Sequence, residues 1–151
     1  MIIRLIAVGT LAAAVGFAAW VRLAPFDTAT WHADPEAGTR TGNPNDALMG
    51  PGGDREAIAF PESPDALLAR LDQIALAEPR TTRLAGDPAD AHVTYVQRSA
   101  LMGYPDVISV KALPSGGGST LVMWSRARFG LSDLGVNAKR VSRWVAALSD
   151  G

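Results

Sequence analysis

The chain of 151 residues contains no cysteine. It therefore forms no disulfide, no thiolate metal site and no cysteine nucleophile. This absence gives no indication of the redox compartment, because a cysteine-free protein is compatible with oxidising and reducing compartments alike. Histidine is also scarce, since His32 and His92 are the only two, and neither belongs to a motif with the spacing of metal ligands. We therefore expect no metal site.

The chain also lacks an excess of charge of either sign. Its 14 lysine and arginine residues face 15 aspartate and glutamate residues, and no run of basic residues interrupts this balance. Because nucleic acid is attracted by a basic field, we expect no nucleic-acid partner, and the sequence identifies no protein partner. The glycine run at residues 116–118 lacks the strand-to-helix context of a phosphate-binding loop. We interpret it as a hairpin turn and expect no cofactor.

One long apolar run is present, at residues 5–21, with Arg4 before it and Arg22 after it. A helix of this length extends about 26 Å, close to the hydrocarbon core of a bilayer at about 30 Å. Flanking arginines and an aromatic residue such as Trp20 suit the membrane interfaces. We predict a single-pass membrane anchor over residues 1–24. A cleaved signal peptide is the alternative, because small residues are frequent in this segment.

The orientation of the anchor follows from the arrangement of the chain rather than from charge. Positive residues on the two sides of the apolar run are nearly balanced. An N-terminal anchor followed by one long domain usually leaves that domain outside the cytoplasm. We expect an inner-membrane protein whose C-terminal domain is periplasmic, in a Gram-negative cell envelope.

Residues 25–56 are rich in proline and glycine and have no apolar periodicity, which is typical of an irregular tether. A different interpretation is that Trp31, Leu48 and Met49 contact the domain, because a free linker rarely retains a tryptophan. The globular domain is expected to begin at residue 57 and to extend to residue 151.

Two amphipathic helices are predicted in this domain. Ser63 is a suitable N-cap for the first, which ends before Pro79 because proline disfavours helix in the preceding residue. The second extends over about residues 137–148, with Asn137 as its N-cap. Its expected buried stripe consists of Val141, Trp144, Val145 and Leu148, whereas Lys139, Arg140 and Arg143 are expected in solvent.

Strand patterns lie between the two helices, at residues 80–84, 92–99, 107–113 and 120–129, and residues 58–60 form a possible edge strand. In the longest strand, Met123 and Ser125 share one face and Trp124 the other. Together the elements predict an α+β fold. We expect a two-layer sandwich in which two helices cover one face of an antiparallel sheet of about four strands.

Residues 98–106, with Ser125 and Arg126 and the loop at residues 130–137, resemble the domain of unknown function 1499 family, which occurs in bacteria and plastids. The likeness covers roughly residues 57–148, and its most specific part is the Asp-Leu-Gly-Val-Asn run after an arginine-bearing strand. Residues 21–25, with Trp31 and His32, are similar to the tether of membrane-anchored alphaproteobacterial members. The resemblance implies an envelope location and carries no established activity.

Seven polar residues form the candidate site: Arg98, Asp106, Arg126, Arg128, Ser132, Asp133 and Asn137. We expect Arg126 or Arg128 to pair with Asp133, and Arg98 to pair with Asp106. One interpretation is structural, with these pairs fastening the last helix to the sheet. The other is an anion site, completed by backbone N–H groups at the start of that helix, for a lipid or metabolite bearing carboxylate or phosphate.

The same residues suggest two functions. The first is a membrane-tethered, non-catalytic binding or interaction module. The second is an envelope hydrolase or transferase that uses Asp106 and Asp133. Neighbouring arginines keep both carboxylates ionised, which disfavours acid–base catalysis. Because the serines also lack a histidine at a suggestive spacing, we expect a binding module rather than an enzyme.

Overall fold

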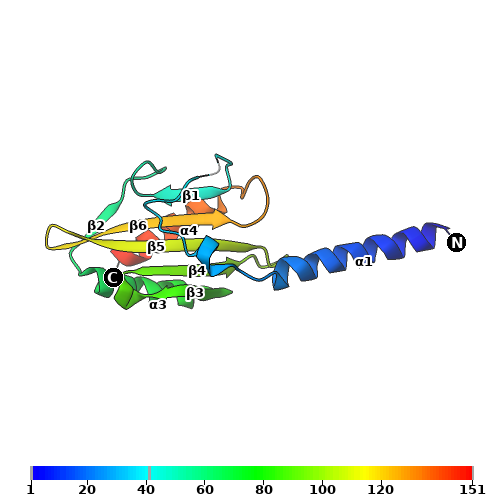
Figure 1. Ribbon diagram of the computed structural model, residues 1–151, viewed down its shortest axis with the longest axis horizontal. Coiled ribbons are helices and arrows are strands. Elements are labelled where there is room, and N and C mark those ends of the chain that lie inside the picture. Colours follow the sequence, from blue (N-terminus) through cyan, green and yellow to red (C-terminus); the bar gives the residue numbers. More distant parts are fainter. Residues whose placement is uncertain (1, 41, 151) are drawn as a thin grey trace.

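The computed structural model describes residues 2–40 and 42–150. A long helix, α1 (Ile2–Leu23), projects from one end of an α+β domain (Figure 1). Its segment Ile6–Leu23 has a mean hydropathy of 1.7 and is long and apolar enough to cross a membrane. The prediction of an α+β fold with an antiparallel sheet is confirmed, and so is the prediction of an apolar N-terminal helix.

The sheet contains six strands, all paired antiparallel, in the order β1-β6-β5-β4-β3, with β2 also paired to β6. The strands are β1 (Asp46–Met49), β2 (Ile58–Phe60), β3 (Thr81–Asp87), β4 (His92–Arg98), β5 (Pro105–Ser115) and β6 (Gly118–Ala127). The expectation of about four strands was too low, chiefly because β1 lies inside the predicted tether.

Strand β1 joins residues 25–56 to the core of the domain. Its Met49 lies opposite Met123 and is completely buried, and Leu48 lies opposite Trp124 on the other face. The interpretation that Leu48 and Met49 contact the domain is therefore confirmed. Because β1 completes the sheet beside β6, the sheet does not begin at residue 57.

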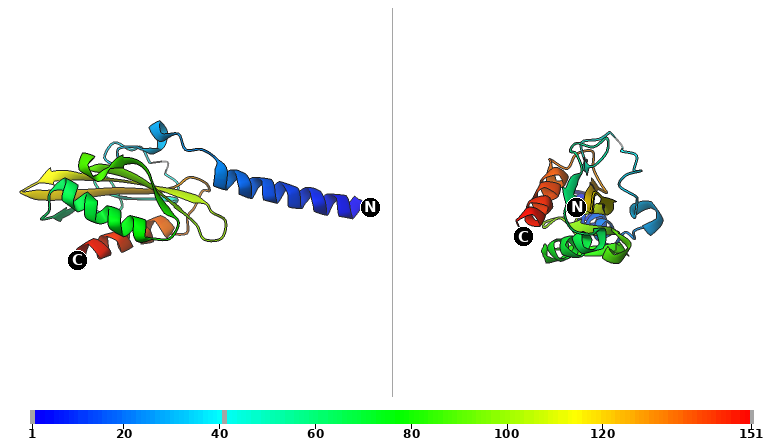
Figure 2. Two further views of the ribbon diagram at one scale, coloured as in Figure 1. Left: turned by 90° about the horizontal axis from the view of Figure 1, so that it is seen from below. Right: turned by 90° about the vertical axis from the view of Figure 1, so that its left-hand side faces the viewer.

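Two helices, α3 (Pro64–Ala77) and α4 (Val136–Ser149), cover the same face of the sheet (Figure 2). Val141, Trp144 and Leu148 of the predicted stripe of α4 are buried, whereas Val145 is only partly buried. Apolar side chains of α3 are buried against the same face, and Trp144 meets Tyr95 of β4 edge to face at 5.6 Å. A short 3₁₀ helix, η1 (Pro88–Asp90), connects β3 to β4. Alternation along the strands directs Tyr95, Val110 and Met123 into this layer and places Trp124 on the opposite face, as predicted for Met123 and Trp124.

The opposite face of the sheet is covered by the chain that leaves α1. This segment contains the short helix α2 (Thr28–Trp31) and crosses over the sheet before β1. Gly38 lies so close to the ring of Trp124 that no side chain would fit there. The carbonyl of Trp31 accepts a hydrogen bond from Arg126 of β6, so the predicted contact of Trp31 with the domain is also confirmed.

Candidate functional site

Two arginines of the candidate site bind the end of α1. Arg98 donates from Nη1 to the carbonyl of Val21 at 3.4 Å, and Arg128 donates to the carbonyls of Ala24 and Pro25 at 3.0 and 2.9 Å. The last carbonyls of a helix lack partners within the helix, and positive charge is favourable there. Arg98 and Arg128 therefore fasten the domain to the C-terminal end of α1.

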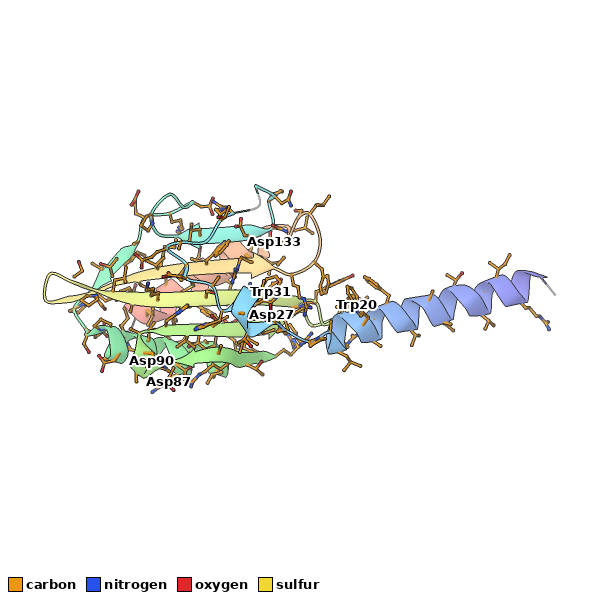
Figure 3. All side chains as sticks on the ribbon, viewed as in Figure 1. Trp20, Asp27, Trp31, Asp87, Asp90 and Asp133 are labelled. Carbon is orange, nitrogen blue, oxygen red and sulfur yellow. The ribbon has the colours of Figure 1, made fainter. Side chains whose placement is uncertain are left out.

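Arg126 fastens the next part of the chain. Its Nη2 donates to the carbonyl of Trp31 and to Oγ of Ser109, both at 2.9 Å, and its guanidinium lies 4.0 Å from the ring centroid of Trp124. Burial lowers the pKa of Arg126 to about 10, and the negative charge of Asp46 opposes only part of this effect. Figure 3 shows Trp31 over the sheet and Trp20 where α1 meets the domain.

The predicted pairing of Asp133 with Arg126 or Arg128 is wrong. Asp133 accepts hydrogen bonds from the backbone N–H groups of Gly135 at 2.9 Å and Asn137 at 2.7 Å. This carboxylate therefore occupies the N-terminus of α4, where we had expected an external anion. Asn137 is likewise not the N-cap; that position is taken by Gly135 with φ of 79°, in a left-handed conformation that glycine adopts without strain.

The predicted pair of Arg98 with Asp106 is also wrong, because Asp106 pairs with Arg140 instead. Nη2 of Arg140 lies 2.7 Å from Oδ2 of Asp106, and the Arg140 side chain is only 3% exposed. Its Nε donates to Gln97 at 2.6 Å, and its Nη1 donates to Ser125 at 2.9 Å and to Asn137 at 2.6 Å. Arg140 thus joins α4 to three strands, whereas we had predicted it in solvent.

Burial raises the pKa of Asp106, and the nearby negative charge of Asp133 adds to that rise, while Arg140 opposes it. Asp106 and Asp133 both line a cavity of about 520 Å³, here called the proximal pocket because Phe17 of α1 forms part of its wall. Tyr104 and Phe129 provide further apolar wall. The pocket therefore brings two acidic groups beside an aromatic surface, next to α1.

A second hollow of about 400 Å³, here called the arginine groove, adjoins the proximal pocket. The two share Ser99, Asp106 and Val136 in their walls. Four arginines and two carboxylates line the groove: Arg80, Arg98, Arg140, Arg143, Glu78 and Asp106. Glu78 is half-buried, which tends to raise its pKa, but hydrogen bonds from Arg143 and Gln97 lower it overall. Because four arginines face two carboxylates, the groove has an excess of positive charge.

The seven predicted site residues thus lie at five different places. Asp106, Ser132 and Asp133 line the proximal pocket, and Arg98 lines the arginine groove with Asp106. Arg126 borders a smaller cavity of about 190 Å³. Arg128 holds the chain after α1, and Asn137 is fully buried beside Arg140.

Arg80, Arg140 and Arg143 were absent from the predicted site. For Arg140 a signal existed, because it follows Asn137 by three residues and precedes Trp144 by four, which places it on the buried stripe of α4. Within residues 2–40 and 42–150, no group of three or more histidine or acidic side chains is placed to hold a metal ion.

Comparison with known proteins gives one match. A family model described as protein of unknown function (DUF1499) matches residues 32–148. No curated protein and no solved structure matches the chain. The match begins before β1 and ends in the last turn of α4, so it includes all six strands and both packed helices. The chain belongs to the DUF1499 family.

Proposed function

We propose that this protein is a membrane-anchored, non-catalytic module that binds an amphiphile with an anionic head group. The observation that carries the proposal is the continuity of two hollows of different chemistry. An aromatic pocket beside α1 adjoins an arginine-lined groove, and Ser99, Asp106 and Val136 belong to both. A molecule with an apolar tail and a charged head matches this pair of surfaces.

The proximal pocket is suited to the tail. Phe17 belongs to the apolar segment Ile6–Leu23, and it shares the pocket with Tyr104 and Phe129. With α1 in a bilayer, the pocket opens beside the acyl chains of the surrounding leaflet. A lipid tail would then reach it without crossing water, which removes the largest cost of moving apolar surface through solvent.

The arginine groove is suited to the head group. Arg80 is exposed. Within the described part of the chain its side chain makes one hydrogen bond, from Nε to the carbonyl of Arg98 at 3.0 Å. The side chain of Arg143 is 53% exposed and faces the carboxylate of Glu78. Guanidinium groups bind carboxylate and phosphate oxygens in a bidentate manner, so both residues have donors to offer an anion.

We further propose that the protein is a single-pass component of the inner membrane with the domain in the periplasm. The length and apolar character of α1 support the membrane location. The orientation rests on the position of the anchor at the N-terminus, because a long domain after such an anchor is usually exported.

The proposal predicts that Val136→Trp strongly weakens lipid binding. Val136 is 46% exposed and lines both hollows, so a larger side chain there fills them without disturbing the core. We expect phosphatidylglycerol binding to the full chain in detergent, measured by native mass spectrometry, to weaken at least tenfold. The matched control is Ala147→Trp, an exposed position on the same helix outside both hollows. Equal binding by the two variants would contradict the proposal.

The head-group part of the proposal has its own control. Arg80→Ala is expected to weaken the binding of phosphatidylglycerol more than the binding of phosphatidylcholine with the same acyl chains. Lys139→Ala, on an exposed part of α4, is expected to leave the binding of both lipids unchanged. Equal losses for both lipids with Arg80→Ala would show that the groove does not select the anionic head.

The enzyme alternative retains one supporting observation. Asp106 and Asp133 line the same pocket, and the raised pKa of Asp106 is the property required of a general acid. However, both oxygens of Asp133 accept backbone hydrogen bonds, and Asp106 is held by Arg140. An envelope hydrolase or transferase would convert bound phosphatidylglycerol with wild-type protein and leave it intact with Asp106→Asn. We expect unchanged lipid from both proteins, analysed by mass spectrometry after incubation.

A further inference from the structure

The exposed apolar side chains of the domain are concentrated at the end where α1 enters. Leu101 and Met102 lie in the loop between β4 and β5, and Leu131 and Leu134 lie in the loop between β6 and α4. Their exposed fractions are 84%, 37%, 76% and 87%. We call these four residues the loop tips. Outside α1, the other large exposed apolar side chains of the described residues are Leu76 and Val136, and Val136 lies in the wall of the proximal pocket.

The first of these loops contacts the last turn of α1. Nη2 of Arg22 donates to the carbonyl of Leu101 at 3.0 Å. Gly103, with φ of 72°, lies against the side chain of Arg22, where a Cβ would come within 3.0 Å. Leu101 and Met102 are therefore held beside the end of the apolar helix rather than directed away from it.

The second loop reaches further back along α1. The ring of Phe129 lies 5.0 Å from that of Trp20, measured between centroids. Gly130 and Ser132 share the proximal pocket with Phe17. Phe17 precedes Leu23 by six residues, which corresponds to about 9 Å along the helix axis. Wherever Ile6–Leu23 spans the hydrocarbon core, Phe17 lies inside the boundary of that core, so the loop that shares a pocket with Phe17 reaches the depth of the leaflet rather than the water beyond it.

Partly buried and exposed hydrogen bonds hold the loops beside α1. Arg98 and Arg128 bind carbonyls at residues 21–25, and Arg98 also donates to the carbonyl of Gly103 at 3.0 Å. These bonds join the end of α1 to both loops. The loops cannot swing away from the leaflet while the anchor remains in it.

We propose that the loop tips insert into the lipid leaflet that surrounds α1, so that the membrane contacts the domain at a second place beside its anchor. Leucine and methionine carry no charge, and the one acidic side chain of these loops, Asp133, has both oxygens bonded to backbone N–H groups. A lipid leaflet is the partner that fits, because its acyl chains are apolar and would contact both α1 and the loop tips beside it. The inference rests on α1 lying in the membrane, and it is independent of the ligand in the proximal pocket.

The absence of cysteine permits a direct test, because a single introduced thiol is the only labelling site. Full-length protein with Leu131→Cys, Leu134→Cys or Leu101→Cys is labelled with an environment-sensitive fluorophore and reconstituted in phosphatidylcholine vesicles with or without nitroxide-labelled acyl chains. Val15→Cys in α1 is the positive control. Ser115→Cys, in the β5–β6 hairpin at the opposite end of the domain (Figure 1), is the negative control.

We expect labels at 131, 134 and 101 to have blue-shifted emission and to be quenched by the nitroxide lipid, as at 15, while the label at 115 is not quenched. Quenching at 15 without quenching at the three loop positions would overturn this inference and leave the proposed function standing. Absence of quenching at 15 would overturn both, because α1 would then lie outside the bilayer. A blue shift that depends on protein concentration and resists quenching would show that a second copy covers the loops, which also overturns the inference.

Discussion

Replacing Arg140, which is itself buried, by alanine is expected to lower the free energy of unfolding by about 3–5 kcal/mol, because it leaves the largely buried carboxylate of Asp106 without its ion-pair partner. Gln97, Ser125 and Asn137 lose a hydrogen-bond partner at the same time. For a domain of this size the loss corresponds to a fall in Tm of about 10 °C or more. Thermal unfolding of the full chain in detergent measures it.

Arg143 provides the matched control, since it is three residues further along α4 and pairs with Glu78 at the surface. An exposed pair contributes about 0–1 kcal/mol, so Arg143→Ala should change Tm by a few degrees at most. Similar Tm values for Arg140→Ala and Arg143→Ala would contradict the structural role assigned to Arg140. Such a result would indicate that Asp106 reaches solvent instead.

Removal of residues 1–56 is expected to prevent cooperative folding, whereas removal of residues 1–24 is not. The shorter fragment lacks β1, so β6 loses its hydrogen-bonding partner along residues 123–126 and the core loses Met49. Replacing a fully buried methionine by alanine alone costs about 2–5 kcal/mol, which is a large part of the stability of a small domain. Circular dichroism during heating distinguishes a cooperative transition from a gradual one.

Single substitutions separate the effect of β1 from that of truncation. Met49→Ala in the full chain should lower Tm clearly, whereas Leu76→Ala, at an exposed apolar position on α3, should have little effect. A sharp transition in the fragment 57–151, at the temperature of the longer one, would show that β1 is dispensable and that the proline-rich segment is a tether after all.

The elements that could be predicted from the sequence are those with a long periodic pattern. Alternation along β6 correctly assigned Met123 and Trp124 to opposite faces, and the apolar stripe of α4 correctly identified Val141, Trp144 and Leu148 as buried, although it missed Arg140. Strand β1 has only four residues and lies between Pro44 and Gly50, so it is too short to show a period. Its pairing with β6 depends on contacts distant in sequence.

The candidate site was predicted only in part, because the binding partners of its arginines were predicted wrongly. We expected Arg98 and one of the pair Arg126 and Arg128 to bind carboxylates, but all three arginines bind backbone carbonyls. Because every residue has a backbone carbonyl, the sequence does not indicate which carbonyl an arginine will bind. Arg140 was missed for the opposite reason: its spacing indicated burial, but its charge indicated solvent.

The hydrogen bonds between the arginines and the end of α1 have a mechanical consequence. A helix whose apolar length differs from the thickness of its bilayer tilts to compensate. Because Arg98 and Arg128 join this helix to the sheet, the domain must turn with it as one lever. The hairpin of β5 and β6 lies at the far end of that lever (Figure 1), so the same change of tilt displaces it more than any other part of the sheet. With α1 in a bilayer, the angle of the domain would therefore follow the thickness of that bilayer.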